Sequence, residues 1–477
     1  MRNLVLAFML ALMGAGCTLG PDYVRPGLDM PAAWRVENGE ANSLADTAWW
    51  GEFGDPVLDG LIETALKENK DLLIAAKRVE EFEARYGIVR ADLFPQVGAG
   101  ASYTREQVTR EGENKPGPGV ATLTETYSTS LNAAWEIDLW GRIRRSTEAA
   151  RAQLLATEEA RRGVILTLVS DVASAYVNLR GLDRQLEIAR DTVKSREESF
   201  RIFQERYDGG IISLLELTQN KSQYEEALSR IPPIEKAIAL QENGLSVLLG
   251  HNPGPILRGL AIDELTPPAI AAGMPSDLLE RRPDVLQAEQ NLVAANAQIG
   301  VAKAAYFPAI SLTGLFGFAS EDLTDLFLSS AQVWNYSAPL TMPIFTAGKL
   351  SGNVRAAEAV QQQALIGYMQ AVQNAFREVN DALADQRQTG LQLEALGRQV
   401  DSLRQYDEIA RLRYDEGYTD FLTVLDAERS LFNAELAHTQ TRVAVHQARI
   451  GLYKAVGGGW TEAAAVAGAG GKAEKTE

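Results

Sequence analysis

An internal repeat is the feature that most constrains how this 477-residue chain can fold. When the sequence is shifted by 213 positions, Phe94-Pro95 falls on Phe307-Pro308, and six further identities precede it without a gap. When it is shifted by 207 positions, Arg206-Tyr207-Asp208 with Gly210 falls on Arg413-Tyr414-Asp415 with Gly417. The offset changes by six residues between about 96 and 140, where a loop can absorb an insertion. Two copies of this length indicate a duplication, so we expect two related halves at 58–250 and 276–457.

The placement of proline predicts very long helices. The chain has no proline from 119 to 231 and none from 344 to its end. Because proline inside a helix costs about 3 kcal/mol, these stretches permit unbroken helices. Apolar residues recur every three or four positions between 141 and 207, as they do on one face of a helix. We expect helices at about 141–207 and 349–415, each roughly 100 Å long, with return helices at about 213–249 and 420–456. The turns between them lie near 208–212 and 415–420 and contain glycine, which supplies a positive φ.

Alternating segments before each long helix predict strands. From Leu123 to Leu139 the odd positions are mostly apolar and the even positions mostly polar, and the same pattern recurs before the second long helix. Each half therefore contains one β-hairpin, at about 96–139 and about 309–345, with loops at about 108–122 and 320–331. Pro339 and Pro343 weaken the inner half of the fourth strand. The same alternation is also typical of a soluble β-sandwich, and the long helices alone would fit a soluble helical scaffold.

The N-terminus has the pattern of a secretory signal. Arg2 precedes an apolar run from Leu4 to Met13, and small residues follow at 14–16. We expect residues 1–16 to be a signal peptide and Cys17, the only cysteine, to be the new N-terminus of a lipoprotein, anchored by acyl chains. The usual lipoprotein pattern has leucine three residues before the cysteine, where this chain has Gly14. The alternative is an ordinary cleaved signal followed by an incidental cysteine.

The strands decide how such a chain can cross a membrane. After residue 17 no stretch approaches the roughly 18 consecutive apolar residues of a spanning helix. A membrane-spanning form would need a closed barrel of tilted strands. Four strands are too few to close, since about eight are the minimum. A membrane protein of this kind must therefore oligomerise, and spacing alone leaves a dimer, a trimer and a tetramer open.

Composition excludes several classes of function. The formal charge of −17 argues against nucleic acid, which selects basic surfaces. One cysteine and three histidines leave little material for a metal site, and no nucleotide-binding or catalytic-triad motif is found. We therefore expect no enzyme activity, no cofactor and no metal.

Several motifs carry a resemblance to a known family. They are Gly20-Pro21-Asp22-Tyr23, Trp49-Trp50 with Asp55-Pro56, the run from Leu278 to Val285, Arg413-Tyr414 with Gly417, and Leu422 with Leu425-Asp426-Ala427. In this order they resemble the outer membrane factor family of tripartite efflux systems, the TolC-type proteins, and within it the lipoprotein (NodT-like) branch. The resemblance covers residues 17 to about 457, which is nearly the whole chain.

The resemblance implies both an architecture and a function. The family fold is that of an α+β membrane protein. It is a trimeric 12-stranded outer-membrane β-barrel, with four strands from each chain, continued by a long periplasmic α-helical barrel. The function implied is the outer-membrane channel of a tripartite efflux system for small molecules such as drugs or toxic compounds. The partners implied are a periplasmic adaptor, an inner-membrane pump of the RND type and outer-membrane lipid. A conduit for type I protein secretion is the alternative within the family.

The resemblance also assigns roles to residues at the two hairpin turns. These turns are expected at the periplasmic end, where grooves between them would receive adaptor hairpins. The expected docking residues are Arg206, Tyr207, Gly210, Leu214 and Leu215 in the first turn region, and Arg413, Tyr414, Gly417 and Phe421 in the second. The same Arg-Tyr motif also suits a purely structural helix end, because arginine favours the C-terminal dipole and glycine caps it.

A gate is expected next to the second turn. Asp426 matches the family's aperture carboxylate, and Leu422 lies one helical turn before it on the same face. Three copies of Asp426 would form a ring of like charge, and Leu422 an apolar constriction.

Two further segments have structural interpretations. Arg282-Pro283-Asp284 suits the start of a helix, and the N-terminal segment 17–57 is expected to wrap the outside of the barrel. We expect the tail at 458–477 to be disordered.

Overall fold

A computed structural model describes residues 18–28, 31, 34–35, 49–111, 117, 119, 121–266, 275 and 278–458. The expected signal peptide, the expected lipidation site at Cys17 and residues 459–477 of the expected tail lie outside the described residues. Among the described helices, none combines the length and apolarity needed to cross a membrane.

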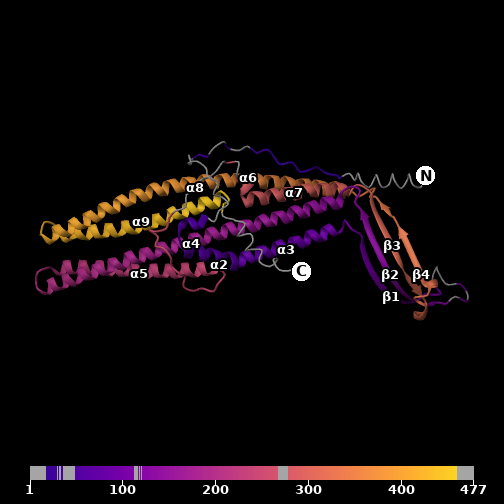
Figure 1. Ribbon diagram of the computed structural model, residues 1–477, viewed down its shortest axis with the longest axis horizontal. Helices are drawn as coiled ribbons and strands as arrows, with labels where there is room; N and C mark the ends of the chain where they lie inside the picture. The colour runs from indigo at the N-terminus through magenta and orange to yellow at the C-terminus, as the bar shows by residue number, and fades with distance from the viewer. Residues whose placement is uncertain are drawn as a thin grey trace. The chain divides into compact units, whose positions relative to one another are not determined.

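The element order of the first half recurs in the second half (Figure 1). Each half runs from a helix of 22 residues through a β-hairpin into a helix of 67 residues and then a return helix of 35 residues. In the first half these elements are α3 (Lys70–Ala91), β1 (Gln96–Gln107), β2 (Leu123–Ile137), α4 (Arg142–Asp208) and α5 (Leu214–Leu248). In the second they are α7 (Pro283–Ala304), β3 (Ala309–Ser320), β4 (Gln332–Ser337), β5 (Leu340–Thr341), α8 (Lys349–Asp415) and α9 (Phe421–Ala455).

Short elements complete the chain. A 3-10 helix η1 (Trp49–Phe53) and a helix α2 (Pro56–Glu68) precede α3, and a short helix α6 (Leu278–Arg281) precedes α7. Two 3-10 turns, η3 (Leu323–Asp325) and η4 (Ser329–Ala331), occupy the loop between β3 and β4. The long helices match the proline-free stretches, as predicted. Helix α5 also continues through Pro232 and Pro233.

The strands form one antiparallel sheet in the order β1-β2-β3-β4, with β5 also paired to β3. The fourth strand is interrupted after Ser337, and the carbonyl of Pro339 accepts a hydrogen bond from Ser311 N at 3.2 Å. Proline has no N–H to donate to a neighbouring strand. The break therefore falls in the inner half of the fourth strand, where the sequence predicted weak pairing. Strand β1 pairs only with β2, and β4 pairs only with β3, so the sheet has two edges within the described residues.

The chain divides into two compact units. One comprises Val79–Thr157, Ala288–Tyr368 and the described part of Met1–Gly27, and it holds the sheet. The other comprises Glu158–Gln287 and the described parts of Leu28–Arg78 and Met369–Glu477, and it holds both helical turns.

In the unit that holds the sheet, the chain after residue 17 is fixed by two ion pairs, each of which has one buried partner. Arg145 is buried and bonds to the carbonyl of Leu19 at 3.1 Å and to the carboxylate of Asp22 at 2.6 Å. Further along, Arg25 makes two bonds, of 2.8 and 2.5 Å, to the buried carboxylate of Glu289. Residues 18–25 are therefore bound against α4 and α7.

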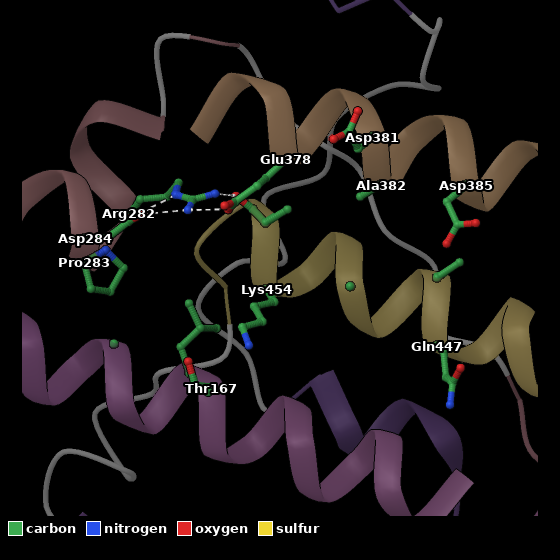
Figure 2. Close-up of a pocket in the computed structure, with 15 residues that line it drawn as sticks. Thr167, Arg282, Pro283, Asp284, Glu378, Asp381, Ala382, Asp385, Gln447 and Lys454 are labelled. Carbon is green, nitrogen blue, oxygen red and sulfur yellow. Dashed lines mark hydrogen bonds and ion pairs between the residues drawn. The ribbon is translucent and has the colours of Figure 1, made fainter. Parts of the chain in front are cut away.

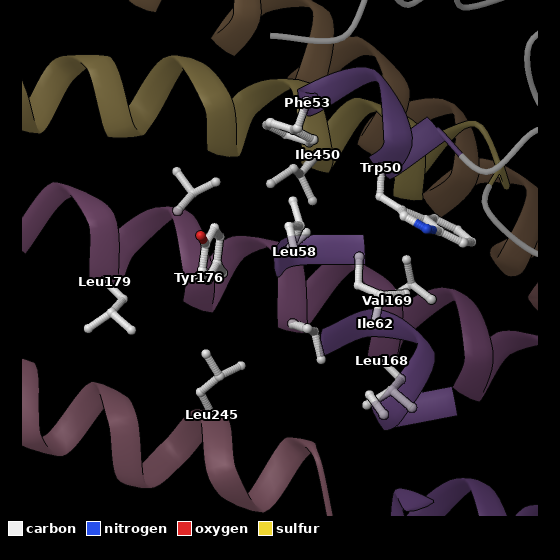
Figure 3. Close-up of a cluster of buried hydrophobic side chains, with 14 of the residues drawn as sticks. Trp50, Phe53, Leu58, Ile62, Leu168, Val169, Tyr176, Leu179, Leu245 and Ile450 are labelled. Atoms are coloured by element: carbon white, nitrogen blue, oxygen red, sulfur yellow. The ribbon is translucent and has the colours of Figure 1, made fainter. Parts of the chain in front are cut away.

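The core of the other unit joins segments from both halves (Figure 3). Side chains from η1, α2, α4, α5 and α9 meet in one cluster, in which Trp49 and Phe53 are 0% exposed. The ring of Trp49 stacks on Tyr453 of α9 with centroids 4.7 Å apart. Trp49, Trp50 and Phe53 thus bury their aromatic side chains in this cluster, as the gain from removing large apolar surface from water favours, and the position of 17–57 on the outside of an assembled barrel stays a prediction.

Asp55 is the polar centre of this core. Its side chain caps α2 by accepting from Val57 N at 2.9 Å, and it also accepts from the Tyr176 hydroxyl at 2.6 Å and from Leu260 N at 3.0 Å. Gly259 lies so close that a Cβ atom there would come within 2.0 Å of the carboxylate. One buried carboxylate thus connects α2, α4 and the chain at 259–260.

We predict that Asp55→Ala destabilises the protein by about 3 kcal/mol, because it removes a helix cap and leaves two buried donors unpaired. Thermal unfolding followed by circular dichroism measures the effect. Tyr176→Phe serves as the milder control, since it keeps the cap and the bond from Leu260 N and removes only the hydroxyl that donates to Asp55 and accepts from Gly259 N. An Asp55→Ala protein that melts with the wild type would contradict this account of the core.

Candidate functional site

The two helical turns have the same backbone geometry. Ile211 N donates to the carbonyl of Arg206 and Gly210 N to that of Tyr207, both at 2.8 Å. The second turn repeats both bonds 207 positions later, at 2.8 and 3.0 Å, with φ of 73° at Gly210 and 79° at Gly417. This is a Schellman helix end, in which glycine adopts the left-handed conformation at no steric cost. The repeated Arg-Tyr-Asp-x-Gly motif therefore ends both long helices in one way.

The return helices begin with side-chain caps of different chemistry. Ser213 and Glu216 form a capping box, in which each side chain bonds to the backbone N–H of the other. At the corresponding place in the second half, Asp420 accepts from Thr423 N at 3.1 Å. Bonds from the Thr423 side chain and backbone lower the pKa of Asp420. In each turn, a Schellman end thus closes the long helix and a side-chain cap begins the return helix.

An aromatic cluster holds the two turn regions together. The ring of Phe203 from α4 lies 4.3 Å from that of Phe421 and 6.2 Å from that of Tyr414. Phe421 is only 6% exposed, and Leu217 of α5 packs in the same cluster. Burial raises the pKa of Tyr414, while the neighbouring Arg206 opposes that change. Tyr414 and Phe421, which sequence reasoning placed among the docking residues, lie mainly inside this cluster.

The exposed apolar residues of the turns form a separate set. Leu214 and Leu215 are each more than half exposed, as docking residues should be. Ile211 and Tyr418 are more exposed still, and sequence reasoning missed them. Both residues lie inside the turn loops, and this position could have indicated from the sequence that they are exposed. A loop between two capped helices has no apolar core in which its side chains could be buried.

The predicted gate residues lie together on an exposed face of α9. Leu422 is 56% exposed, and the Asp426 side chain is 53% exposed. Asp426 also accepts a 2.9 Å bond from Arg429, one turn further along the same helix. Sequence reasoning did not identify this cation, which places a positive charge next to the carboxylate.

The sheet exposes many large apolar side chains. Leu131, Phe316 and Trp334 are cross-strand neighbours on β2, β3 and β4, and Trp334 is 66% exposed. On β1 and β2, Tyr103 and Tyr127 are paired with ring centroids 4.8 Å apart. Exposed apolar area on this scale indicates contact with another apolar phase.

A polar pocket of about 480 Å³ lies beside the start of α7 (Figure 2). Arg282, which is 6% exposed, bonds to Asp284 at 3.0 and 2.7 Å, to Glu378 of α8 at 2.7 Å and to the carbonyl of Ala455 at 2.7 Å. Arg282 thus joins the start of α7, the middle of α8 and the end of α9. The structural role predicted for Arg282-Pro283-Asp284 is confirmed, since α7 begins at Pro283.

The described residues provide few suitably placed ligands for a metal ion. No group of three or more His, Cys, Asp or Glu side chains in the described part of the chain is placed to hold a metal ion. His446 is buried against Phe53, and burial together with Arg442 and Arg449 lowers its pKa to about 4. It is therefore a neutral core residue.

The sequence matches the profile of one protein family in two stretches. The family is described as "Outer membrane efflux protein", and the matches cover residues 61–251 and 274–458. Each stretch corresponds to one of the two halves.

Individual proteins are similar over nearly the whole length. The cation efflux system protein CusC of Escherichia coli O6:H1 (strain CFT073) is 38% identical over 467 residues, covering 96% of this chain and 99% of that protein. The toluene efflux pump outer membrane protein TtgI of Pseudomonas putida is 38% identical, covering 95% and 97%. The crystal structure of the MtrE outer membrane channel of Neisseria gonorrhoeae in its open state superimposes with a TM-score of 0.83 at 32% identity, covering 93% of this chain and 99% of that one.

Proposed function

The chain belongs to the outer membrane efflux protein family, and on that premise we propose that three copies form one conduit served by a periplasmic adaptor and an inner-membrane pump of the RND type. The protein is the outer-membrane channel of an efflux system, located in the outer membrane and extending into the periplasm. We propose small toxic molecules as its cargo. The named relatives handle cations and toluene, so the family accepts chemically different compounds.

The two edges of the sheet are the observation that carries the proposal. In the part of the chain that the structure describes, strands β1 and β4 each have one neighbour, which leaves a row of backbone N–H and C=O groups without a strand partner on each side. Within a bilayer an unpaired edge is not tolerated, because no water is present to bond to it. One chain has too few strands to close on itself. Pairing of β1 with β4 of the next copy removes both edges, and three copies give 3 × 4 = 12 strands.

The side chains of the sheet support a position in lipid. Trp334 and Tyr336 stack on β4 with centroids 5.8 Å apart, and both are largely exposed. Aromatic side chains of this kind concentrate at the two interfaces of membrane barrels. A soluble sheet would leave this area facing water at a cost of roughly 25 cal/mol per Å².

The helical turns support the proposed adaptor contact. Ile211, Leu214 and Leu215 project from the first turn region, and Tyr418 and Leu422 from the second. Their apolar side chains stand on a framework that side-chain caps, Schellman ends and the aromatic cluster make rigid. A rigid surface with apolar anchors suits an amphipathic helical partner, because few groups need to be ordered on binding.

We predict that the double variant Leu214→Glu with Leu215→Glu weakens adaptor binding by roughly a thousandfold, because each buried interface anchor contributes about 2 kcal/mol and every 1.4 kcal/mol is a factor of ten. Binding of purified trimer to adaptor and the resistance of cells to an effluxed compound are the two readouts. Lys221→Glu on the same helix changes the charge by the same −2 and is the matched control. Normal binding and resistance in the double variant, or in Gly417→Arg, would contradict the docking role.

We propose Leu422 and Asp426 as the periplasmic gate. Both are exposed on one face of α9, next to the turn. Around a three-fold axis, three Asp426–Arg429 pairs would form a charged ring beside a ring of Leu422 side chains. Such a ring holds counter-ions and narrows the aperture.

Removal of this carboxylate is expected to open the aperture. We predict that Asp426→Ala raises the single-channel conductance in planar bilayers. Asp401→Ala is the matched control, because Asp401 also pairs with an arginine three residues later but lies on α8. Equal conductance of Asp426→Ala and wild type would remove Asp426 from the gate.

A further inference from the structure

A layer of polar side chains separates two apolar clusters in the helical hairpins. The first cluster, at the turns, contains Phe203, Phe421 and Val424, and the second contains Ile188, Ala189 and Phe432. Between them lie five residues from four helices, which we call the polar layer. They are Arg196 of α4, Gln223 of α5, Asp407 and Arg411 of α8, and Glu428 of α9.

Polar contacts in the layer join the two helices of each hairpin, and the opposite charges of Arg196 on α4 and Glu428 on α9 attract one another between the hairpins. Arg411 bonds to Asp407 at 3.0 Å and to Glu428 at 2.8 Å, which joins α8 to α9. Arg196 is 4% exposed, donates to the carbonyl of Gln223 at 2.7 Å and lies 5.9 Å from the ring of Phe432. A groove of about 250 Å³, lined by both α4 and α9, reaches Glu428 from the outside.

The polar layer is incompletely bonded. Three of its buried atoms, Arg196 Nε, Gln223 Oε1 and Asp407 Oδ1, have no hydrogen-bond partner within the described structure. Each such group costs about 1–3 kcal/mol relative to its hydrated form. The apolar clusters hold the hairpins together, whereas this layer favours their separation.

Glu428 is the more deeply buried of the two carboxylates in the layer, with its side chain 12% exposed against 16% for Asp407. It faces Asp407 and Arg411 from α8 and Arg196 from α4, while Glu226 and Arg230 of α5 act on Arg196. Burial raises the pKa of Glu428, Arg411 and Arg196 oppose that rise, and Asp407 adds to it. The net direction is upward.

We propose that the polar layer is a proton-responsive coupling between the two helical hairpins, and that Glu428 is the group that responds. In the packed form the Glu428 side chain is 12% exposed, whereas separation of the hairpins would hydrate its carboxylate. The packed form therefore binds the proton more tightly. Linkage gives the sign: acid favours the packed hairpins, and this stabilisation is lost as the pH rises through the pKa of the packed form. The inference concerns one chain and goes beyond the proposed function, since it requires neither a pump nor an adaptor.

The chain contains its own control for this inference. Glu435 lies seven residues after Glu428 on α9 and pairs with Arg404 at 2.9 Å, seven residues before Arg411 on α8. Each of the two ion pairs therefore joins an arginine of α8 to a glutamate of α9. The Glu435 side chain is 24% exposed, twice the value for Glu428.

Hydrogen exchange of the full-length protein in detergent tests the proposal. Amide protection in α4 and α9 on both sides of the layer is measured at about pH 5.5 and about pH 8, with exchange times corrected for the intrinsic pH dependence of the chemistry. We expect wild-type protection to be several-fold higher in acid. Glu428→Gln, which mimics the protonated form, should keep the high protection at both values, and Glu435→Gln should respond as the wild type does.

Several outcomes would overturn the proposal. They are equal wild-type amide protection at both pH values, a wild-type change of protection with pH in Glu428→Gln, and loss of that change in Glu435→Gln. Arg411→Gln is the second variant, for the case in which Glu428→Gln does not assemble. It removes a cation that favours the ionised carboxylate, so the transition should move to higher pH. An unmoved transition would also overturn the proposal.

Discussion

Unpaired backbone groups at the edges of the sheet are the constraint on which the rest of the structure depends. Among the described residues, strands β1 and β4 each lack a neighbour on one side, and the short fifth strand, β5, pairs with β3 and covers neither β1 nor β4. In a bilayer only closure removes such edges. This requirement accounts for assembly of several copies and for a channel lumen that no single chain could enclose, while the exposed apolar side chains of the sheet fit a position in lipid.

The long helices have a different requirement, because the turns that end them must form a rigid surface. Two helices of 67 residues follow the strands along the chain, and the same Schellman geometry ends both. The duplicated backbone nevertheless has different side chains in its two copies. Ser213 caps one return helix and Asp420 the other, and only the second copy contains the exposed pair Leu422 and Asp426. The first hairpin thus presents apolar anchors, whereas the second adds the proposed gate.

The sequence predicted those features that depend on local chemistry. The absence of proline marked α4 and α8, alternation marked the hairpins, and Pro339 marked the break in the fourth strand. Features that depend on distant contacts were missed. Nothing local shows that Trp49 stacks on Tyr453, that Phe421 is buried against Phe203, or that Asp55 bonds to Tyr176. The polar layer was missed for the same reason, because its residues come from four helices and each resembles an ordinary polar or charged surface residue.

If three copies close one channel, the intact assembly has the mass of three chains. Native mass spectrometry of the full-length protein, extracted from outer membranes in detergent, counts the chains in the complex. The account predicts a detergent-requiring complex of three chains, and the same spectrum reports any acyl mass on Cys17. A water-soluble monomer or dimer would contradict the account, because the edges of β1 and β4 would then remain open.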